Sequence, residues 1–155
     1  DRARRASRDD HQLARLVANP GLVPQAVEEF VRFDPAVHYF RRTATRDTEL
    51  RGRRIEKGQK VVMWYPAANR DEDVFVDPDR FDIGRVDNPH LAFGIGEHFC
   101  LGANLARLEL RVVFRHLIER VDTIELAGPV ERLRSSFLGG IKRMPVRYRI
   151  KPARV

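Results

Sequence analysis

Apolar residues in the first third of the chain recur at the spacing of two short helices. Residues 11–18 carry such a pattern, which ends at the helix breaker Asn19-Pro20-Gly21. A second helix is predicted to begin near Pro24, whose fixed φ suits a first turn, and to end at Asp34-Pro35. Its predicted apolar stripe consists of Val23, Ala26, Val27, Phe30 and Val31. The pattern therefore predicts two consecutive helices before residue 35.

The period then changes from that of a helix to that of a strand. Apolar and polar residues alternate through residues 38–42 and again through residues 60–65. Turn signals lie between these segments at Arg51-Gly52 and Lys57-Gly58. We therefore expect a small antiparallel sheet in this part of the chain.

The second half is predicted to combine irregular chain, one long helix and short strands. Residues 66–88 are rich in Asp, Arg, Asn and Pro and show little periodicity, so an irregular meander is expected. A helical period returns at Ala103, and its predicted apolar face consists of Leu105, Leu108, Val112, Val113 and Leu117. Residues 122–126 and 136–150 have the composition of strands. The predicted fold class is mainly α with small antiparallel β-sheets (α+β).

The composition limits the classes of protein to which the chain can belong. Its 155 residues, 43% hydrophobic and 33% charged, fit one soluble globular domain. The net charge of +7 invites a nucleic-acid-binding hypothesis, but basic and acidic residues are interleaved after residue 10 and no basic-aromatic stripe occurs. We interpret the Arg-rich residues 1–10 as a disordered tail. No segment is long and apolar enough to span a membrane, and a single cysteine without an export signal predicts a cytoplasmic protein.

The only cysteine, Cys100, lies between Gly94, Gly96 and Gly102 and directly precedes the long helix. One sulfur cannot form an internal disulfide or supply the several ligands of a structural zinc or an iron–sulfur cluster, whereas a haem needs one axial ligand. The glycines permit sharp turns, and the helix N-terminus favours a thiolate over a thiol. The alternative is a lone cysteine that acts as a small hydrophobic residue.

The run from Phe93 to Gly102 resembles the haem-binding loop of the cytochrome P450 family, Phe-x-x-Gly-x-His-x-Cys-x-Gly, at each named position. This resemblance implies haem b, with Cys100 as the axial ligand of the iron. His98 and Arg42 resemble the family residues that bind the haem propionates, and alternation puts Arg41 and Arg42 on opposite faces, so only one of them can point at the ring. The other implied cofactor-binding residues are Phe93, Gly94, Gly96, Gly102 and Ala106.

The same resemblance implies a buried charged trio. Glu29 and Arg32 are three residues apart and share a helix face, although the spacing of Glu28 and Arg32 is also that of a pair. The family pattern selects Glu29, and Arg80, in Pro-Asp-Arg-Phe, matches the third position. We expect this trio to be structural and to hold the meander beneath the haem, because a buried charge without its partner is costly. The alternative is an exposed pair on the helix surface.

From Gln12 onward the order of features resembles the C-terminal part of a bacterial haem-thiolate monooxygenase, which inserts one oxygen atom of dioxygen into a C–H bond of a lipophilic substrate. The stretch 133–145 resembles members that oxidise steroid side chains or branched fatty acyl chains. The implied substrate-pocket candidates, which are otherwise ordinary core residues, are Val37, His38, Phe40, Phe137 and Leu138. A ferredoxin or flavoprotein is expected to donate electrons near a basic ridge of Arg107, Arg111 and Arg115, which is otherwise a solvated helix face.

The oxygen-activating helix that the family places before the Glu-x-x-Arg helix has no counterpart in residues 1–11. We therefore expect residues 11–155 to be the C-terminal haem-binding portion of a truncated cytochrome P450 domain, with an exposed hydrophobic surface. The second hypothesis is a haem-binding or partner-binding fragment without oxygenase activity.

Overall fold

The computed structural model describes residues 11–152, so the expected tail in residues 1–10 lies outside the described range. Residues 11–18 are helical, and a single 3-10 turn, η1 (Pro20–Leu22), leads into helix α2 (Val23–Phe33). Helix α2 ends where predicted, since Pro35 disfavours helical backbone at the residue before it. Both predicted helices are confirmed.

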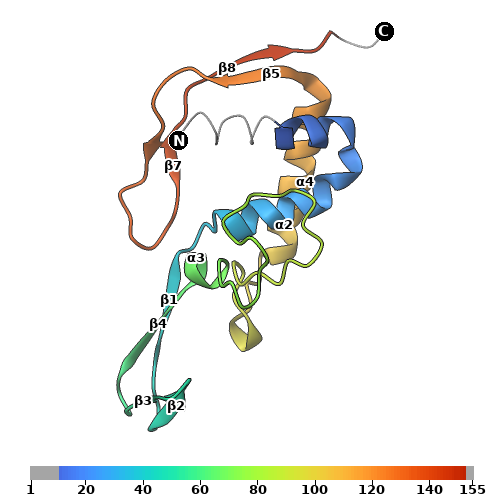
Figure 1. Cartoon of the computed structure of the whole chain (residues 1–155). Coiled ribbons are helices and arrows are strands. Elements are labelled where there is room, and N and C mark those ends of the chain that lie inside the picture. The colour runs from blue at the N-terminus through green and yellow to red at the C-terminus, as the bar shows by residue number, and fades with distance from the viewer. Residues whose placement is uncertain (1–10, 153–155) are drawn as a thin grey trace.

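Strands β1 (Tyr39–Thr43) and β4 (Lys60–Trp64) pair antiparallel, as the alternation predicted. Between them, β2 (Thr48–Leu50) and β3 (Arg53–Ile55) form a second two-stranded pair. Figure 1 shows these four strands as an arm that extends away from the helices.

The short helix α3 (Tyr65–Ala68) opens the meander, which continues without regular strands or helices to a 3-10 turn, η2 (Gly96–His98). Helix α4 (Ala103–Arg120) begins at the predicted residue. Strand β5 (Val121–Leu126) then pairs with β8 (Val146–Ile150), and β6 (Glu131–Arg132) pairs with β7 (Ile141–Arg143). The sequence did not predict β6, a strand of two residues.

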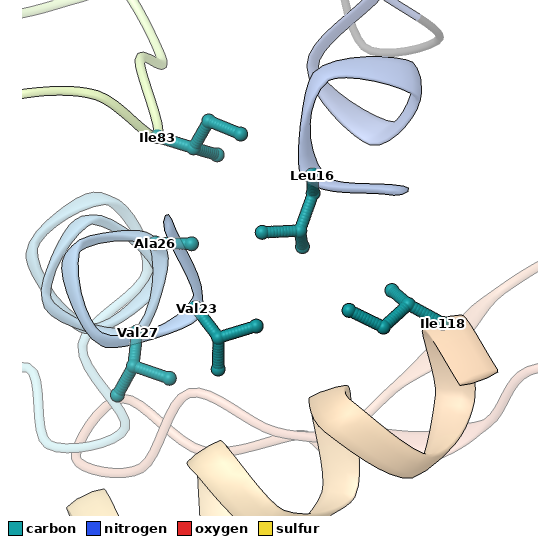
Figure 2. Close-up of a cluster of buried hydrophobic side chains, with 6 residues drawn as sticks. All are labelled: Leu16, Val23, Ala26, Val27, Ile83 and Ile118. Carbon is teal, nitrogen blue, oxygen red and sulfur yellow. The ribbon is translucent and has the colours of Figure 1, made fainter. Parts of the chain in front are cut away.

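The hydrophobic core lies where the first helix, α2, α4 and the meander meet. Figure 2 shows the six buried side chains that these segments contribute to one cluster: Leu16, Val23, Ala26, Val27, Ile83 and Ile118. Phe30 of α2 extends the core, because its ring stacks on Phe114 of α4 at 4.4 Å and on Phe81 of the meander at 5.5 Å. The core therefore fixes the meander and α4 against α2.

Helix α4 packs on α2 through one of its two apolar faces. Ile118 is buried in the core and Leu110 and Phe114 pack against it. The residues of the predicted apolar face are all exposed, namely Leu105, Leu108, Val112, Val113 and Leu117. Apolar residues thus lie on two faces of α4, and the expected exposed hydrophobic surface is present on the second.

Candidate functional site

The cysteine loop folds back on itself. The backbone amide of Cys100 donates to the carbonyl oxygen of Phe93 at 2.9 Å, and the amide of Phe99 donates to Gly96 at 3.0 Å. Gly94 and Gly96 have φ values of +72° and +70°, in the left-handed region that glycine tolerates. At Gly94 a Cβ would also lie 3.4 Å from the carbonyl oxygen of His98. These two glycines therefore let the chain return to Phe93 at the cysteine.

The thiol of Cys100 is exposed and lies just before the first turn of α4. The carbonyl of Cys100 accepts from the amide of Ala103 at 3.2 Å, so the sulfur stands next to the helix N-terminus, where a negative charge is favoured. Large apolar side chains surround this position in the sequence, and Ile95, Phe99 and Leu101 are all exposed. The loop thus presents one sulfur beside an uncovered apolar surface.

The remaining residues assigned to the cofactor site lie on the loop, on α4 and on β1. His98 is exposed in η2, and Ala106 is half-buried in the first turn of α4. Arg42 is exposed on β1, and its guanidinium donates to the carbonyl of Arg41 at 3.2 Å. The donor set of one thiol, an exposed imidazole and an exposed guanidinium fits a flat apolar cofactor that takes one axial sulfur and carries anionic groups at its edge.

A buried polar hub underlies the loop, and Arg32 is at its centre. The Glu29 and Arg32 side chains are fully buried and share two hydrogen bonds, of 2.7 and 2.8 Å. Both terminal nitrogens of Arg32 also donate to backbone carbonyls of the meander, which belong to Asn69, Pro78 and Arg80. Every guanidinium N–H of Arg32 therefore has an acceptor, which ties α2 to the meander.

Glu29 is equally well paired. Besides Arg32, its carboxylate accepts from the backbone amide of Asp82 at 2.9 Å and from the side-chain amide of Asn88 at 3.2 Å. The buried Asn69 completes the hub, because its side chain donates to the carbonyl of Arg32 and accepts from the amide of Leu91. The meander is thus held on α2 at several points between residues 69 and 91.

The third cation of the hub is Arg85, which corrects our assignment of Arg80. The Arg80 side chain is 57% exposed, and its guanidinium lies 3.9 Å from Asp82. The Arg85 side chain is 11% exposed and its Nε lies 3.3 Å from Glu29. Arg80 contributes its backbone carbonyl, which accepts from both Arg32 and Arg85. The Pro-Asp-Arg-Phe motif thus identified the correct turn of the meander, but the Arg80 side chain points outward from that turn.

Replacement of these two arginines should separate their roles. We expect Arg80→Gln to change the free energy of unfolding by less than about 0.5 kcal/mol, since only an exposed side chain is altered. Arg85→Gln should cost about 1–3 kcal/mol, because a buried carboxylate loses a cationic neighbour. Chemical denaturation of both variants measures the difference. Equal losses of unfolding free energy in the two variants would mean that the Arg80 side chain is part of the hub.

Glu28, which the spacing had left as an alternative partner of Arg32, points to α4 instead. Its carboxylate accepts two hydrogen bonds of 2.8 and 2.9 Å from separate nitrogens of Arg107. It also lies 3.1 Å from Nε2 of His90, whose side chain is 3% exposed. The Nδ1 atom of His90 accepts from the amide of Ala92, so Nε2 carries the proton and donates to Glu28.

Three ionisable groups have shifted pKa values, namely His90 and Glu28 at this contact and Asp82 elsewhere in the meander. Burial lowers the pKa of His90, and the hydrogen bond to Glu28 offsets this only in part. Partial burial raises the pKa of Glu28, but the hydrogen bonds from Arg107 and His90 outweigh it, so the pKa lies below its ordinary value. The pKa of Asp82 is also lowered, since bonds from the Gly84 amide and from Arg15 outweigh partial burial.

These shifts predict that acid destabilises the fold in two steps. A group whose pKa is lowered by folding contributes stability that is fully present above its unfolded value and is lost as the pH falls through its folded value. For His90 the loss begins below about pH 6.5, and for Glu28 and Asp82 it begins near pH 4. We expect His90→Gln to remove the first step and leave the second. Thermal unfolding measured from pH 7.5 to 3.5 tests this, and an unchanged first step would exclude His90 as its source.

The substrate-pocket candidates come together although they are far apart in the sequence. Val37 and Leu138 form an isolated antiparallel bridge, and the amide of His38 donates to the carbonyl of Phe137 at 2.9 Å. The rings of Phe40 and Phe137 meet edge to face, with centroids 5.6 Å apart. Tyr39, which the sequence did not single out, contacts both Phe137 and Trp64. The chain thus gathers an aromatic cluster at the base of the β1–β4 arm.

The predicted basic ridge on α4 is not uniform. Arg107 is bound to Glu28, and Arg111 lies 3.8 Å from the same carboxylate. Arg115 is exposed. The part of the ridge that faces solvent is therefore its C-terminal part. Among the described residues, no helix has the length and apolarity needed to cross a membrane.

The chain is similar in sequence to known proteins. Residues 8–151 match the sequence model of the family described as Cytochrome P450. The chain is 46% identical to Cytochrome P450-terp of Pseudomonas sp over 142 residues, which cover 92% of this chain and 33% of that protein. It is 52% identical to a methyl-branched lipid omega-hydroxylase of Mycobacterium tuberculosis over 129 residues, 83% of this chain and 30% of that protein. The chain thus spans about a third of the length of these relatives.

A solved structure shows the same fold. The crystal structure of P450BioI in complex with a hexadec-9Z-enoic acid-ligated acyl carrier protein superposes with a TM-score of 0.88 at 37% identity. The match covers 90% of this chain and 37% of that one.

Proposed function

The chain belongs to the cytochrome P450 family, and from that premise we propose that it binds haem b through Cys100 as part of a bacterial monooxygenase. The observation that carries the proposal is the exposed thiol of Cys100 at the N-terminus of α4. The α4 amides and dipole favour the deprotonated sulfur, which is the form that binds iron. When bound, a thiolate-ligated haem supplies the redox chemistry that inserts one atom of dioxygen into a C–H bond.

The other residues of the site hold and orient the cofactor in this proposal. The imidazole of His98 and the guanidinium of Arg42 would donate to the propionates, while Gly94, Gly96 and Gly102 would keep side chains away from the ring. Phe93 of the loop and Ala106 of α4 would also contact the cofactor. The hub of Glu29, Arg32 and Arg85 supports the loop through the meander.

We propose a lipophilic substrate, with a fatty acyl chain or a steroid side chain as the class to test first. Val37, His38, Phe40, Phe137 and Leu138 would line its pocket, and the aromatic contacts of Phe40 and Phe137 support this assignment. A ferredoxin or flavoprotein would supply electrons, and it would dock on the exposed Arg115 and half-buried Arg111 rather than on Arg107.

The test is the absorption spectrum of the haem-loaded protein after reduction and addition of carbon monoxide. The proposal expects a thiolate-type band, and its absence would refute the ligand assignment. Incubation with peroxide and a branched fatty acid then tests oxygenation, by mass spectrometry of hydroxylated products. A thiolate-type band without product would favour the second hypothesis, a haem-binding fragment without oxygenase activity.

A further inference from the structure

We propose that Glu28, His90 and Arg107 act together as a clamp that positions the Cys100 loop. These three residues come from α2, the meander and α4, and Glu28 is hydrogen-bonded to each of the other two. They are positioning residues, because their effect on the sulfur passes through Phe93. The inference rests on the proposed function, in which that sulfur binds iron.

Arg107 joins the two limbs of the loop. It lies on α4, which begins three residues after Cys100, and its guanidinium carbon is 4.6 Å from the centre of the Phe93 ring. Phe93 begins the loop, and its carbonyl accepts the hydrogen bond from the amide of Cys100. Stacking of Arg107 on Phe93 therefore connects the limb that enters the loop to the helix that leaves it.

Glu28 fixes the guanidinium plane for this stacking. Its carboxylate binds Arg107 through Nε and Nη2, an arrangement that restrains rotation of the guanidinium. Glu28 itself lies on α2, which the core and the hub hold rigidly. Contacts with α2, the most buried of the described helices, therefore help to set the position of Phe93, and the loop does not set it alone.

His90 also restrains the limb of the loop that carries Phe93. It donates to Glu28, accepts from the amide of Ala92, and its ring centre is 5.9 Å from that of Phe93. The next residue, Leu91, is held by the side chain of the buried Asn69. Two residues before Phe93, the backbone is therefore already held to α2 through Asn69.

Removal of one member should loosen the loop without disrupting the hub. Arg107→Gln abolishes the stacking cation and leaves Glu28 with His90 as a remaining partner. Arg107→Lys keeps the charge and a bond to Glu28 but loses the planar group that stacks on Phe93. Arg115→Gln, on the same helix and exposed, is the matched control.

The primary measurement is amide hydrogen exchange in the haem-free full chain, resolved by residue. We expect the Cys100 amide to exchange about tenfold faster in Arg107→Gln and Arg107→Lys, the effect of losing roughly one charge-assisted contact. The amide of Ala106, which bonds to Gly102 within α4, should exchange at the wild-type rate, and Arg115→Gln should change neither. In the haem-loaded protein, the affinity for haem should fall about 10- to 100-fold in both Arg107 variants.

Two results would overturn the clamp. One is that the Cys100 amide of Arg107→Lys exchanges at the wild-type rate. The other is an equal loss of protection at Cys100 and Ala106, which would reduce Arg107 to a residue that stabilises α4. If Arg107→Gln fails to fold, Arg107→Lys decides. A wild-type protein without the thiolate-type band would contradict the proposed function alone, since the exchange measurement needs no haem.

Discussion

Cys100→Ser is expected to abolish the thiolate-type band of the reduced, carbon-monoxide-bound protein. Serine matches cysteine in size, but its hydroxyl stays protonated near neutral pH and does not supply an anionic sulfur ligand. The chain has one cysteine, so the variant retains no alternative thiolate. The measurement is the visible spectrum after haem loading, reduction and exposure to carbon monoxide.

The same variant should keep its fold, because the Cys100 side chain is exposed and makes its loop hydrogen bond through the backbone. Circular dichroism and thermal unfolding of the haem-free protein provide that control. Persistence of the thiolate-type band in Cys100→Ser would show that another group binds the iron. Loss of the band together with loss of the fold would require the Ala variant to separate the two effects.

Substitution of Arg32 by leucine is expected to lower the free energy of unfolding by about 3–5 kcal/mol. The change leaves the fully buried Glu29 carboxylate without its bidentate partner and removes one donor from each of three meander carbonyls. A typical domain is stable by only about 5–15 kcal/mol, so this variant should lose a large fraction of its stability. Urea denaturation at 25 °C measures the loss.

The exposed pair of Arg54 and Asp47 provides the control for this experiment. Its atoms lie 3.1 Å apart, but both side chains are exposed. Arg54→Leu should cost less than about 1 kcal/mol, because solvent screens an exposed ion pair. Equal losses in the two variants would mean that burial of the Glu29–Arg32 pair does not determine its contribution.

Local features of the sequence were sufficient to predict the helices and the cysteine loop. Pro24 and Pro35 restrict their local backbone and lie at the start and just beyond the end of α2. Gly94 and Gly96 have the positive φ values that the predicted sharp turns of the loop need. The start of α4 at Ala103 follows from the same loop. Such features depend on neighbours in the sequence, so the sequence reveals them directly.

Features that depend on distant contacts were predicted less well. Helix α4 carries apolar residues on two faces, and only contact with α2 selects the face of Phe114 and Ile118. Likewise, the choice between Arg80 and Arg85 is made by the path of the meander around Glu29. The role of His90 had no signal of its own in the sequence, because it arises where three separate segments meet.

The hub also has a consequence for the rate at which the chain folds. The acceptors of Arg32 lie 37, 46 and 48 residues away in the sequence. Part of the intervening chain has little regular structure that would restrict its conformations before these groups meet. Closing such long loops costs chain entropy before any bond in the hub forms. We therefore expect these contacts to form after the transition state, so that weakening them speeds unfolding and leaves the refolding rate almost unchanged.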